Sequence, residues 1–451
     1  MKYSLILYSL LCMCLSVSCK KYLDAKPDKS LVVASQVSDY QALLDNNGIM
    51  NRASPSAGEG SADNYYLDYD NWAALYNEAF KNIYIWGDEI TYDLFPNDWG
   101  QAFDQIYFCN TVIEGLKTIE QNDNNITEWN NADGSAYFFR ANAYLKLVLT
   151  WANAYDSTTA ASDPGVPLRL NTDFNEVSVR ASVKDCYERI INDDEQAIRL
   201  LPVNALFATR PSKKAAYGLM ARTYLAMRNY HKAGLYADSC LQLYNTTMDY
   251  NLLDSTAAYP IPAFNDEVLF YAAASAPELS NSIANVDTVL FASYSDSDLR
   301  KTIFFNDKGN GKFKFRGSYN GNNGLFTGIA TDEIYFVRAE CYAREGKIDA
   351  ALDDLNALLS KRWKHGMYIY HNADNTNDAL TLILNERRKE LLFRDLRWMD
   401  IKRLNKEQNR QITLKRSLNG VEYTLEPNEP KYALPLPQSV LQLTGMPQNP
   451  R

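Results

Sequence analysis

The segment ARTYLAMRNYHKAGLYA, residues 221–237, recurs in altered form 118 positions later as AECYAREGKIDAALDDL, residues 339–355. In both copies a small residue is followed three positions later by a tyrosine, which places the two side chains on one helical face. A second alanine, Ala233 or Ala351, allows a return helix to pack closely on the first, and Gly346 suits the intervening turn. The two segments therefore predict two helical hairpins of similar construction.

These hairpins resemble tetratricopeptide repeats, and other parts of the chain predict further helices. Arg140-Ala141-Asn142-Ala143-Tyr144 is a weaker relative of the first helix, and Ser182 begins another helix with capping-box spacing. A short helix is expected from Gln36 to Leu44, followed by a loop from Asn46 to Asp63. Apolar residues recur at helical spacing over residues 72–84, 103–116 and 137–149.

Between Thr246 and Ala330 the composition shifts to Asn, Ser, Gly, Asp and Tyr. Short β-like runs occur in it at residues 267–272, 288–294, 302–305 and 312–315. A long irregular insertion is typical of functional surface, and it separates the hairpins, so we do not expect a continuous array. The predicted fold is mainly α, with tetratricopeptide-like helical hairpins and an irregular β/loop-rich insertion.

The composition argues against several classes of protein. The 451 residues are 46% hydrophobic, enough for a large core, and the formal net charge of −9 argues against a nucleic-acid partner. With three histidines and no GxGxxG, GxxxxGKS/T, GxSxG or HExxH motif, we assign no metal, no cofactor and no catalytic residue. The 31 tyrosines suit contacts with sugars or protein partners.

Four cysteines are expected to be small buried hydrophobes: Cys109, Cys186, Cys240 and Cys341.

The N-terminal residues predict export. Lys2 supplies a positive charge, and Leu5 to Val17 form an apolar run too short to span a bilayer, so residues 1–18 are interpreted as a signal peptide. Leu15-Ser16-Val17-Ser18-Cys19 resembles a bacterial lipobox, which predicts acylation of Cys19 and a lipid anchor. The alternative is ordinary secretion, with Cys19 as a plain thiol.

Four features distributed over nearly the whole chain form a recognisable set. They are Cys19 followed by Lys20-Lys21-Tyr22-Leu23-Asp24 and Pro27; Arg140-Ala141-Asn142-Ala143-Tyr144-Leu145; the helix-patterned run from Asn385 to Arg403; and the closing Leu434-Pro435-Leu436-Pro437 with Met446-Pro447-Gln448-Asn449-Pro450. Together they resemble the SusD/RagB outer-membrane lipoproteins of Bacteroidetes. One departure is Arg394-Asp395, which stands where that family often has an acidic residue and a glycine.

The resemblance implies a non-catalytic surface lipoprotein of the outer membrane. Such a protein captures a glycan, or a peptide, and delivers it to a SusC-like TonB-dependent transporter. The implied organisation is a signal peptide (1–18), an N-terminal SusD-like helical region (19–245) and a C-terminal SusD/RagB region (246–451) that includes the 246–330 insertion. The alternatives are a tetratricopeptide-type scaffold that binds a peptide or protein and, with less support, a glycoside hydrolase.

The ligand-determining regions are expected near residues 58–100 and in the 246–330 insertion. Loop rings beside amide and carboxylate groups suit sugar binding, because sugar C–H faces stack on aromatic rings. The candidate ligand-binding residues are Asn64, Tyr65, Tyr66, Asp68, Tyr69, Trp86 and Trp99. Trp72 and Tyr76 have the spacing of core anchors of a helix instead. The nearby acidic residues would serve a hydrolase only as an opposed pair, and acidic side chains in such loops are usually solvated.

The Arg-rich run from Glu386 to Arg403 has the charge of an anion site but also the apolar stripe of a core helix. We interpret it as a structural helix whose arginines hold neighbouring segments, with Glu390 and Arg394 as an i,i+4 pair.

Overall fold

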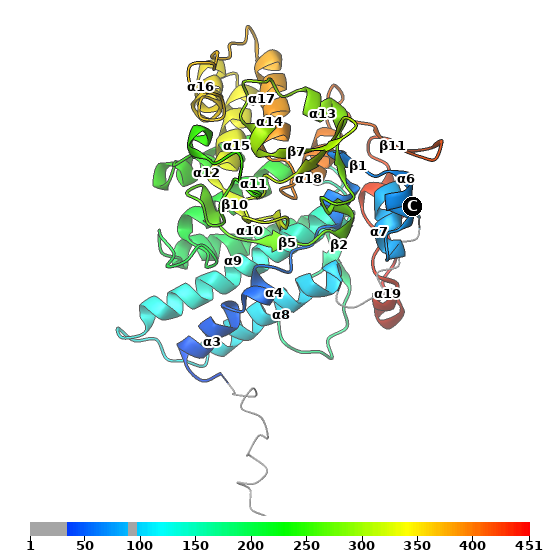
Figure 1. Ribbon diagram of the computed structural model, residues 1–451. Coiled ribbons are helices and arrows are strands. Elements are labelled where there is room, and N and C mark those ends of the chain that lie inside the picture. The colour runs from blue at the N-terminus through cyan, green and yellow to red at the C-terminus, as the bar shows by residue number, and fades with distance from the viewer. Residues whose placement is uncertain (1–33, 89–96) are drawn as a thin grey trace, which may run out of the picture.

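The computed structural model describes residues 34–88 and 97–451, so the predicted signal peptide and Cys19 lie outside the described residues. Consecutive helices pack side by side through most of the molecule, from α8 at the bottom of the view to α16 at the top (Figure 1). These helices are α8 (Asp98–Leu116), α9 (Ile126–Trp151), α10 (Val183–Leu200), α11 (Lys213–Ala226), α12 (Tyr230–Leu243), α15 (Thr331–Arg344) and α16 (Ile348–Leu359). The prediction of a mainly α fold is confirmed.

The two predicted hairpins are α11–α12 and α15–α16. Both bounds of α15 lie 118 positions after those of α11, as the repeat predicts. The turns correspond as well, because Arg228 and Gly346, at equivalent positions, have φ values of 59° and 80°. However, α12 packs directly on α15, so the array continues in space and the expected interruption is wrong. The insertion is looped out between two helices that remain in contact.

Small side chains allow the helices to approach closely. Ala221, Ala233, Ala339 and Ala351 are all buried, as the repeat motif requires. The four cysteines of the described chain are also buried and free, which confirms their expected packing role. In α9, Arg140 donates to both carboxylate oxygens of Asp193 on α10 at 2.8 Å, so the arginine of this early motif joins two helices.

The insertion folds into short elements with a hydrophobic core of their own. They are η2 (Tyr250–Leu252), β4 (Val268–Phe270), β5 (Ala273–Ala274), η3 (Pro277–Leu279), β6 (Asn285–Val286), α13 (Thr288–Ala292), α14 (Arg300–Ile303), β7 (Phe305–Gly309), β8 (Lys312–Phe315), β9 (Leu325–Phe326) and β10 (Ile329–Ala330). The strand predictions at 267–272 and 312–315 are confirmed by β4 and β8. Residues 288–292 are helical instead, because the Asp287 side chain caps α13 by accepting from Leu290 N. Residues 302–305 run from the end of α14 into β7.

The N-terminal segment differs from its prediction in two places. Its elements are α3 (Val37–Leu44), α4 (Asn47–Met50), α5 (Ala57–Ser61), β1 (Tyr65–Tyr66), α6 (Tyr69–Ala73) and α7 (Glu78–Ile85). The helix at 37–44 is confirmed, but the predicted loop at 46–63 contains two short helices. The predicted helix 72–84 breaks at Asn77, which caps α7 by accepting from Ala79 N. Antiparallel pairing of β1 with β6 joins this segment to the insertion.

The run from 385 to 403 is not one helix. It is divided between α17 (Thr376–Glu390) and α18 (Arg397–Leu404), because Phe393 and Asp395 have φ values of 55° and 58°. Asp395 therefore adopts the left-handed conformation that glycine favours, at the position where the resemblance implies a glycine. The predicted Glu390–Arg394 pair is wrong, since Glu390 bonds to Arg300 and Arg362 while Arg394 bonds to Asp332.

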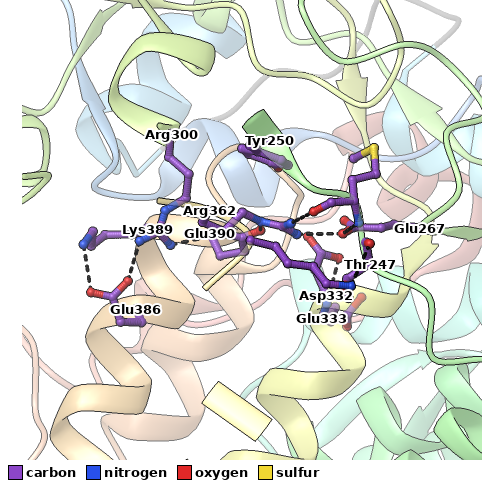
Figure 2. A network of polar contacts seen from close by, with 12 residues as sticks. Thr247, Tyr250, Glu267, Arg300, Asp332, Glu333, Arg362, Glu386, Lys389 and Glu390 are labelled. Carbon is purple, nitrogen blue, oxygen red and sulfur yellow. Dashed lines mark hydrogen bonds and ion pairs between the residues drawn. The ribbon is translucent and has the colours of Figure 1, made fainter. Parts of the chain in front are cut away.

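Buried ion pairs tie α17 to the insertion (Figure 2). Arg300 and Arg362 are fully buried and share Glu390, which accepts from them at 3.0 and 2.6 Å. Arg362 also donates to Glu267 at 2.7 Å. This network fixes the insertion against the helical array. Within the Arg-rich run itself, Arg394 pairs with Asp332 at 3.1 Å and Arg403 pairs with Glu340 at 2.6 Å, which confirms its interpretation as a structural element.

The remaining elements complete the surface. They are β2 (Pro164–Pro167), β3 (Arg180–Ser182), β11 (Leu414–Leu418), β12 (Val421–Leu425), η4 (Pro430–Tyr432) and α19 (Gln438–Thr444). In the closing motif, Asn449 donates to the carbonyls of Trp151 and Leu434 at 2.8 and 2.6 Å. The last residues are thus held against the C-terminus of α9.

Candidate functional site

A cleft of about 340 Å³ is lined by residues from the stretches 52–83, 97–101 and 275–278. The two sides of the cleft come from the two regions expected to determine the ligand. Its walls include Arg52, Tyr76, Phe80, Asp98, Gln101 and Glu278. This cleft is the candidate functional site.

Two pairs of aromatic rings follow one another along residues 69–80. Tyr69 and Trp72 on α6 have ring centroids 5.9 Å apart, and Tyr76 and Phe80 meet edge to face at 5.6 Å. Tyr69 is 45% exposed and Tyr76 is 76% exposed, whereas Trp72 and Phe80 are partly buried. Because Trp72 Nε1 donates to Lys81 O at 3.1 Å, the ring is held in place. We call these four residues the 69–80 rings; two of them, Tyr76 and Phe80, line the cleft.

Two carboxyl groups also line the cleft. Asp98 is half-buried and accepts from Ser56 N and Ala57 N at 2.7 and 2.9 Å, and burial raises its pKa to about 6. Glu278 is 1% exposed, and neither of its carboxylate oxygens has a hydrogen-bond partner among the described residues. Burial raises the pKa of Glu278 to about 8. Gly60 makes room for this carboxyl, since a Cβ there would lie 2.2 Å from Glu278 Oε1.

Four of the residues predicted to bind ligand lie in the core. Tyr65, Trp86 and Trp99 are only 3%, 2% and 5% exposed, and Asn64 is buried. Tyr65 donates to Gly60 O, Trp86 donates to Ser61 O, and Trp99 packs edge to face on Trp151. In this structure these side chains are enclosed by protein and offer no surface to a ligand. The physical reason is that each ring continues an apolar cluster that the local sequence does not reveal.

The other three predicted residues lie at the surface beside β6. Asp68 receives a hydrogen bond from Asn285 at 3.1 Å and pairs with Lys312 at 2.9 Å. Tyr66 is partly buried, and Tyr69 is exposed. The role of Tyr66, Asp68 and Tyr69 in ligand binding stays a prediction, now at a defined surface.

The sequence reasoning missed Tyr76. Its spacing from Trp72 suggested the core face of one helix, but the chain leaves the helix before Tyr76 and re-enters it after Asn77. An Asn followed by an acidic residue is a helix-start signal, and it could have indicated the break.

Most of the acidic residues near this region are tied to cations. Although burial opposes its charge, Asp63 has a pKa well below its usual range because of its ion pair with Arg397 at 2.6 Å. Three further pairs are Asp68–Lys312, Glu78–Lys81 and Asp88–Lys431. Glu89 and Asp93 lie outside the described residues. Asp98 and Glu278 are therefore distinctive in lining a cavity without a partner cation among the residues that the structure describes.

A second hollow, of about 760 Å³, is more apolar. Tyr107 and Phe174 contact each other there with centroids 4.9 Å apart and ring planes tilted by 34°, and Leu443 also lines the hollow. Its polar neighbours Asn110 and Thr172 are already bonded within the protein. This hollow is less suited than the cleft to a hydroxyl-rich ligand. Within residues 34–88 and 97–451 no group of His, Cys, Asp or Glu could hold a metal ion.

Comparisons with known proteins agree with the resemblance in the sequence. A family model described as "Starch-binding associating with outer membrane" matches residues 21–225, and one described as "SusD family" matches residues 310–451. No curated protein matches the chain.

Solved structures share the fold over almost the whole chain. A SusD superfamily protein from Bacteroides thetaiotaomicron is 20% identical with a TM-score of 0.75, and the match covers 92% of this chain and 100% of the other. A SusD superfamily protein from Bacteroides fragilis is 21% identical (TM-score 0.74, 92% and 99% covered). A SusD-like carbohydrate binding protein from Bacteroides vulgatus is also 21% identical (TM-score 0.66, 91% and 97% covered). With both ends of the sequence matched by models of one family and the fold shared throughout, the chain belongs to the SusD/RagB family.

Proposed function

We propose that this protein is a lipid-anchored outer-membrane protein that captures glycans at the cleft and passes them to a SusC-like TonB-dependent transporter. The matching family description names starch binding and the outer membrane, and one structural relative is described as carbohydrate binding. The SusD family consists of binding proteins, so we assign no reaction to the carboxyl groups of the cleft.

The observation that carries the proposal is the exposed ring of Tyr76 at the mouth of the cleft. A large aromatic ring left 76% exposed is not a packing residue, and its face is free to stack on the C–H face of a sugar. The cleft beside it offers amide and hydroxyl groups from Asn77, Gln101 and Ser54 for the sugar hydroxyls. A ring platform beside a polar cleft is the arrangement that a glycan-binding site requires.

Replacing Tyr76 by Ala tests the site. We expect binding to weaken about tenfold, equivalent to about 1.4 kcal/mol, with little change in the melting temperature because the ring is exposed. The measurement is affinity electrophoresis and calorimetric titration against amylopectin, galactomannan, mixed-linkage β-glucan and arabinoxylan.

Tyr370→Ala is the matched control, because Tyr370 is also an exposed tyrosine, 66% exposed, in the loop between α16 and α17. The site is supported if the wild-type protein binds at least one polysaccharide, Tyr76→Ala weakens that binding, and Tyr370→Ala leaves it intact. Equal affinities in all three proteins would exclude the cleft.

Anchoring and transport are the further parts of the proposal. The described residues include no helix long and apolar enough to cross a membrane. Attachment is assigned to Cys19, and co-purification with a SusC-like TonB-dependent transporter would test the partnership.

A further inference from the structure

Resting on the proposed glycan-binding function, we propose that the cleft accepts an uncharged sugar unit and rejects a unit that carries a carboxylate or sulfate, with Glu278 and Asp98 as the specificity-determining residues. The chemical class of sugar that the cleft accepts depends on which charged groups line it and on which of these charges the protein itself neutralises.

The two carboxyl groups belong to opposite sides of the cleft. Asp98 comes from the first turn of α8, and Glu278 comes from η3 in the insertion. Neither forms an ion pair within the described parts of the chain. Asp98 is held by the two backbone amides of Ser56 and Ala57, and neither carboxylate oxygen of Glu278 has a hydrogen-bond partner among the residues that the structure describes. An acidic group left unpaired in a buried wall is costly, so its usual explanation is a function.

The cations nearby do not cancel this charge. Arg52 also lines the cleft, but it is an exposed residue and pairs with neither carboxyl. Arg416 lies behind Glu278, where its guanidinium donates to the carbonyls of Tyr65, Gly60 and Ala62. Its charge lowers the pKa of Glu278 less than burial raises it. Among the described residues that line the cleft, Arg52 is therefore the one cation against two carboxyl groups, and it neutralises neither of them.

These charges discriminate between classes of sugar. A sugar hydroxyl can donate a charge-assisted hydrogen bond to the partly exposed carboxylate of Asp98, whereas the buried carboxylate oxygens of Glu278 act through their charge alone. A uronate or sulfate group brings a second negative charge into the same partly enclosed, low-dielectric space, where repulsion is stronger than in water. Neutral units are favoured over anionic ones on both counts.

The discrimination should depend on pH, because both carboxyls titrate in an accessible range. Burial raises the pKa of Asp98 to about 6 and that of Glu278 to about 8. The negative charge of Asp395 adds to the effect of burial on the pKa of Asp98. The charge of Asp98 likewise raises the pKa of Glu278, whereas the positive charge of Arg416 lowers it. At pH 5 both carboxyls are largely neutral, and at pH 9 both are ionised. Rejection of an anionic glycan should grow across this interval.

The test compares each neutral polysaccharide that binds, for example amylopectin or galactomannan, with the same polymer oxidised at C6 to the uronate. The wild-type protein should bind the neutral form at least tenfold more tightly at pH 9, and the ratio should fall to about threefold or less at pH 5. The double variant Asp98→Asn, Glu278→Gln should show a ratio of about threefold or less at both pH values. The control Glu422→Gln, an exposed residue of β12, should retain the wild-type ratios.

The outcomes separate this inference from the proposed function. Equal or tighter wild-type binding of the oxidised polymer, or a ratio that neither pH nor the double variant changes, would overturn it. If the double variant does not fold, the wild-type pH profile alone decides. Binding to no neutral polysaccharide at all would overturn the proposed function and this inference together.

Discussion

Unpaired buried carboxyl groups are a recurring feature of this chain. Besides Glu278, the carboxyls of Glu59 and Asp194 are buried, and neither belongs to an ion pair among the described residues. Burial raises the pKa of Glu59 to about 8 and holds that of Asp194 well above its usual range. Glu59 and Glu278 lie close to the candidate site, on α5 and η3, whereas Asp194 lies inside α10.

Replacing Asp194 by Asn should make the fold less sensitive to alkaline pH. Because the pKa is higher in the folded state, the stability that the acid form supports is present below pH 4 and is lost as pH rises. Asparagine stays neutral, so the variant should gain roughly 1 to 3 kcal/mol relative to wild type at pH 8 and much less at pH 4. Urea unfolding at the two pH values measures this difference, with the exposed Asp353→Asn on the helical array as control. A pH-independent effect of the Asp194 change would contradict the assignment.

For individual residues, the sequence predicted which types of side chain lie in the candidate site better than it predicted which positions they occupy. Rings beside Asp and Asn were expected between residues 58 and 100, and the exposed Tyr69 and Tyr76 lie there. Trp86 and Trp99 were misplaced because their neighbours are distant in sequence: Trp86 packs with Trp398, and Trp99 packs with Trp151. Burial that long-range contacts create leaves no local pattern.

Helices and turns were more predictable, because their signals are local. The 118-residue repeat gave both hairpins and the turn at Gly346. The break between α17 and α18 was missed, since Phe393 and Asp395 adopt left-handed conformations without glycine. Their backbone is held by tertiary contacts: Phe393 is buried, and Asp395 accepts from the buried Lys146 at 3.0 Å.

Replacing Gly346 by Ala should isolate the backbone contribution of the hairpin turn. With φ at 80° and nothing within 4 Å of an added Cβ, the substitution causes no clash and should cost about 1 kcal/mol through the left-handed conformation alone. Gly48→Ala is the control, because Gly48 lies in α4 without a positive φ and its Cβ would make only an ordinary contact at 3.4 Å. Chemical unfolding of both variants gives the comparison. A Gly346 variant as stable as wild type would show that the turn relaxes to another conformation.

The ion-pair network is the connection between the insertion and α17. Arg362→Met should destabilise the protein by on the order of 3 to 5 kcal/mol, because it removes the charge that pairs with the buried Glu267. Lys415→Met, which breaks the exposed pair with Glu422 at 2.9 Å, should cost no more than about 1 kcal/mol. Thermal unfolding of the two variants measures the contrast. Similar small losses in both would show that the network adapts without Arg362.

For the molecule as a whole, the position of the insertion is what makes the site. The array from α8 to α16 would be complete without residues 246–330, since α12 already packs on α15. The insertion instead places Glu278 opposite Asp98 and pairs β6 with β1 beside Asp68. The sequence predicted that this insertion carries functional surface. It did not predict that the insertion packs on the N-terminal segment, because strand pairs only two residues long, such as β1–β6, leave no recognisable sequence pattern.

Attachment to the membrane is the last property to test on the whole molecule, and we propose that it depends on Cys19. A net charge of −9 gives the chain no attraction to anionic lipid, so stable association requires covalent acyl chains. Cys19→Ala should therefore leave a folded protein that moves from the membrane pellet to the soluble fraction after cell fractionation. Cys109→Ala, at a buried cysteine of α8, is the control and should remain in the pellet. The experiment is done in a strain that expresses no SusC-like transporter, so that this protein partner cannot retain the variant. If Cys19→Ala still sediments with the membrane in that strain, the anchor lies elsewhere and the lipoprotein part of the proposal is wrong.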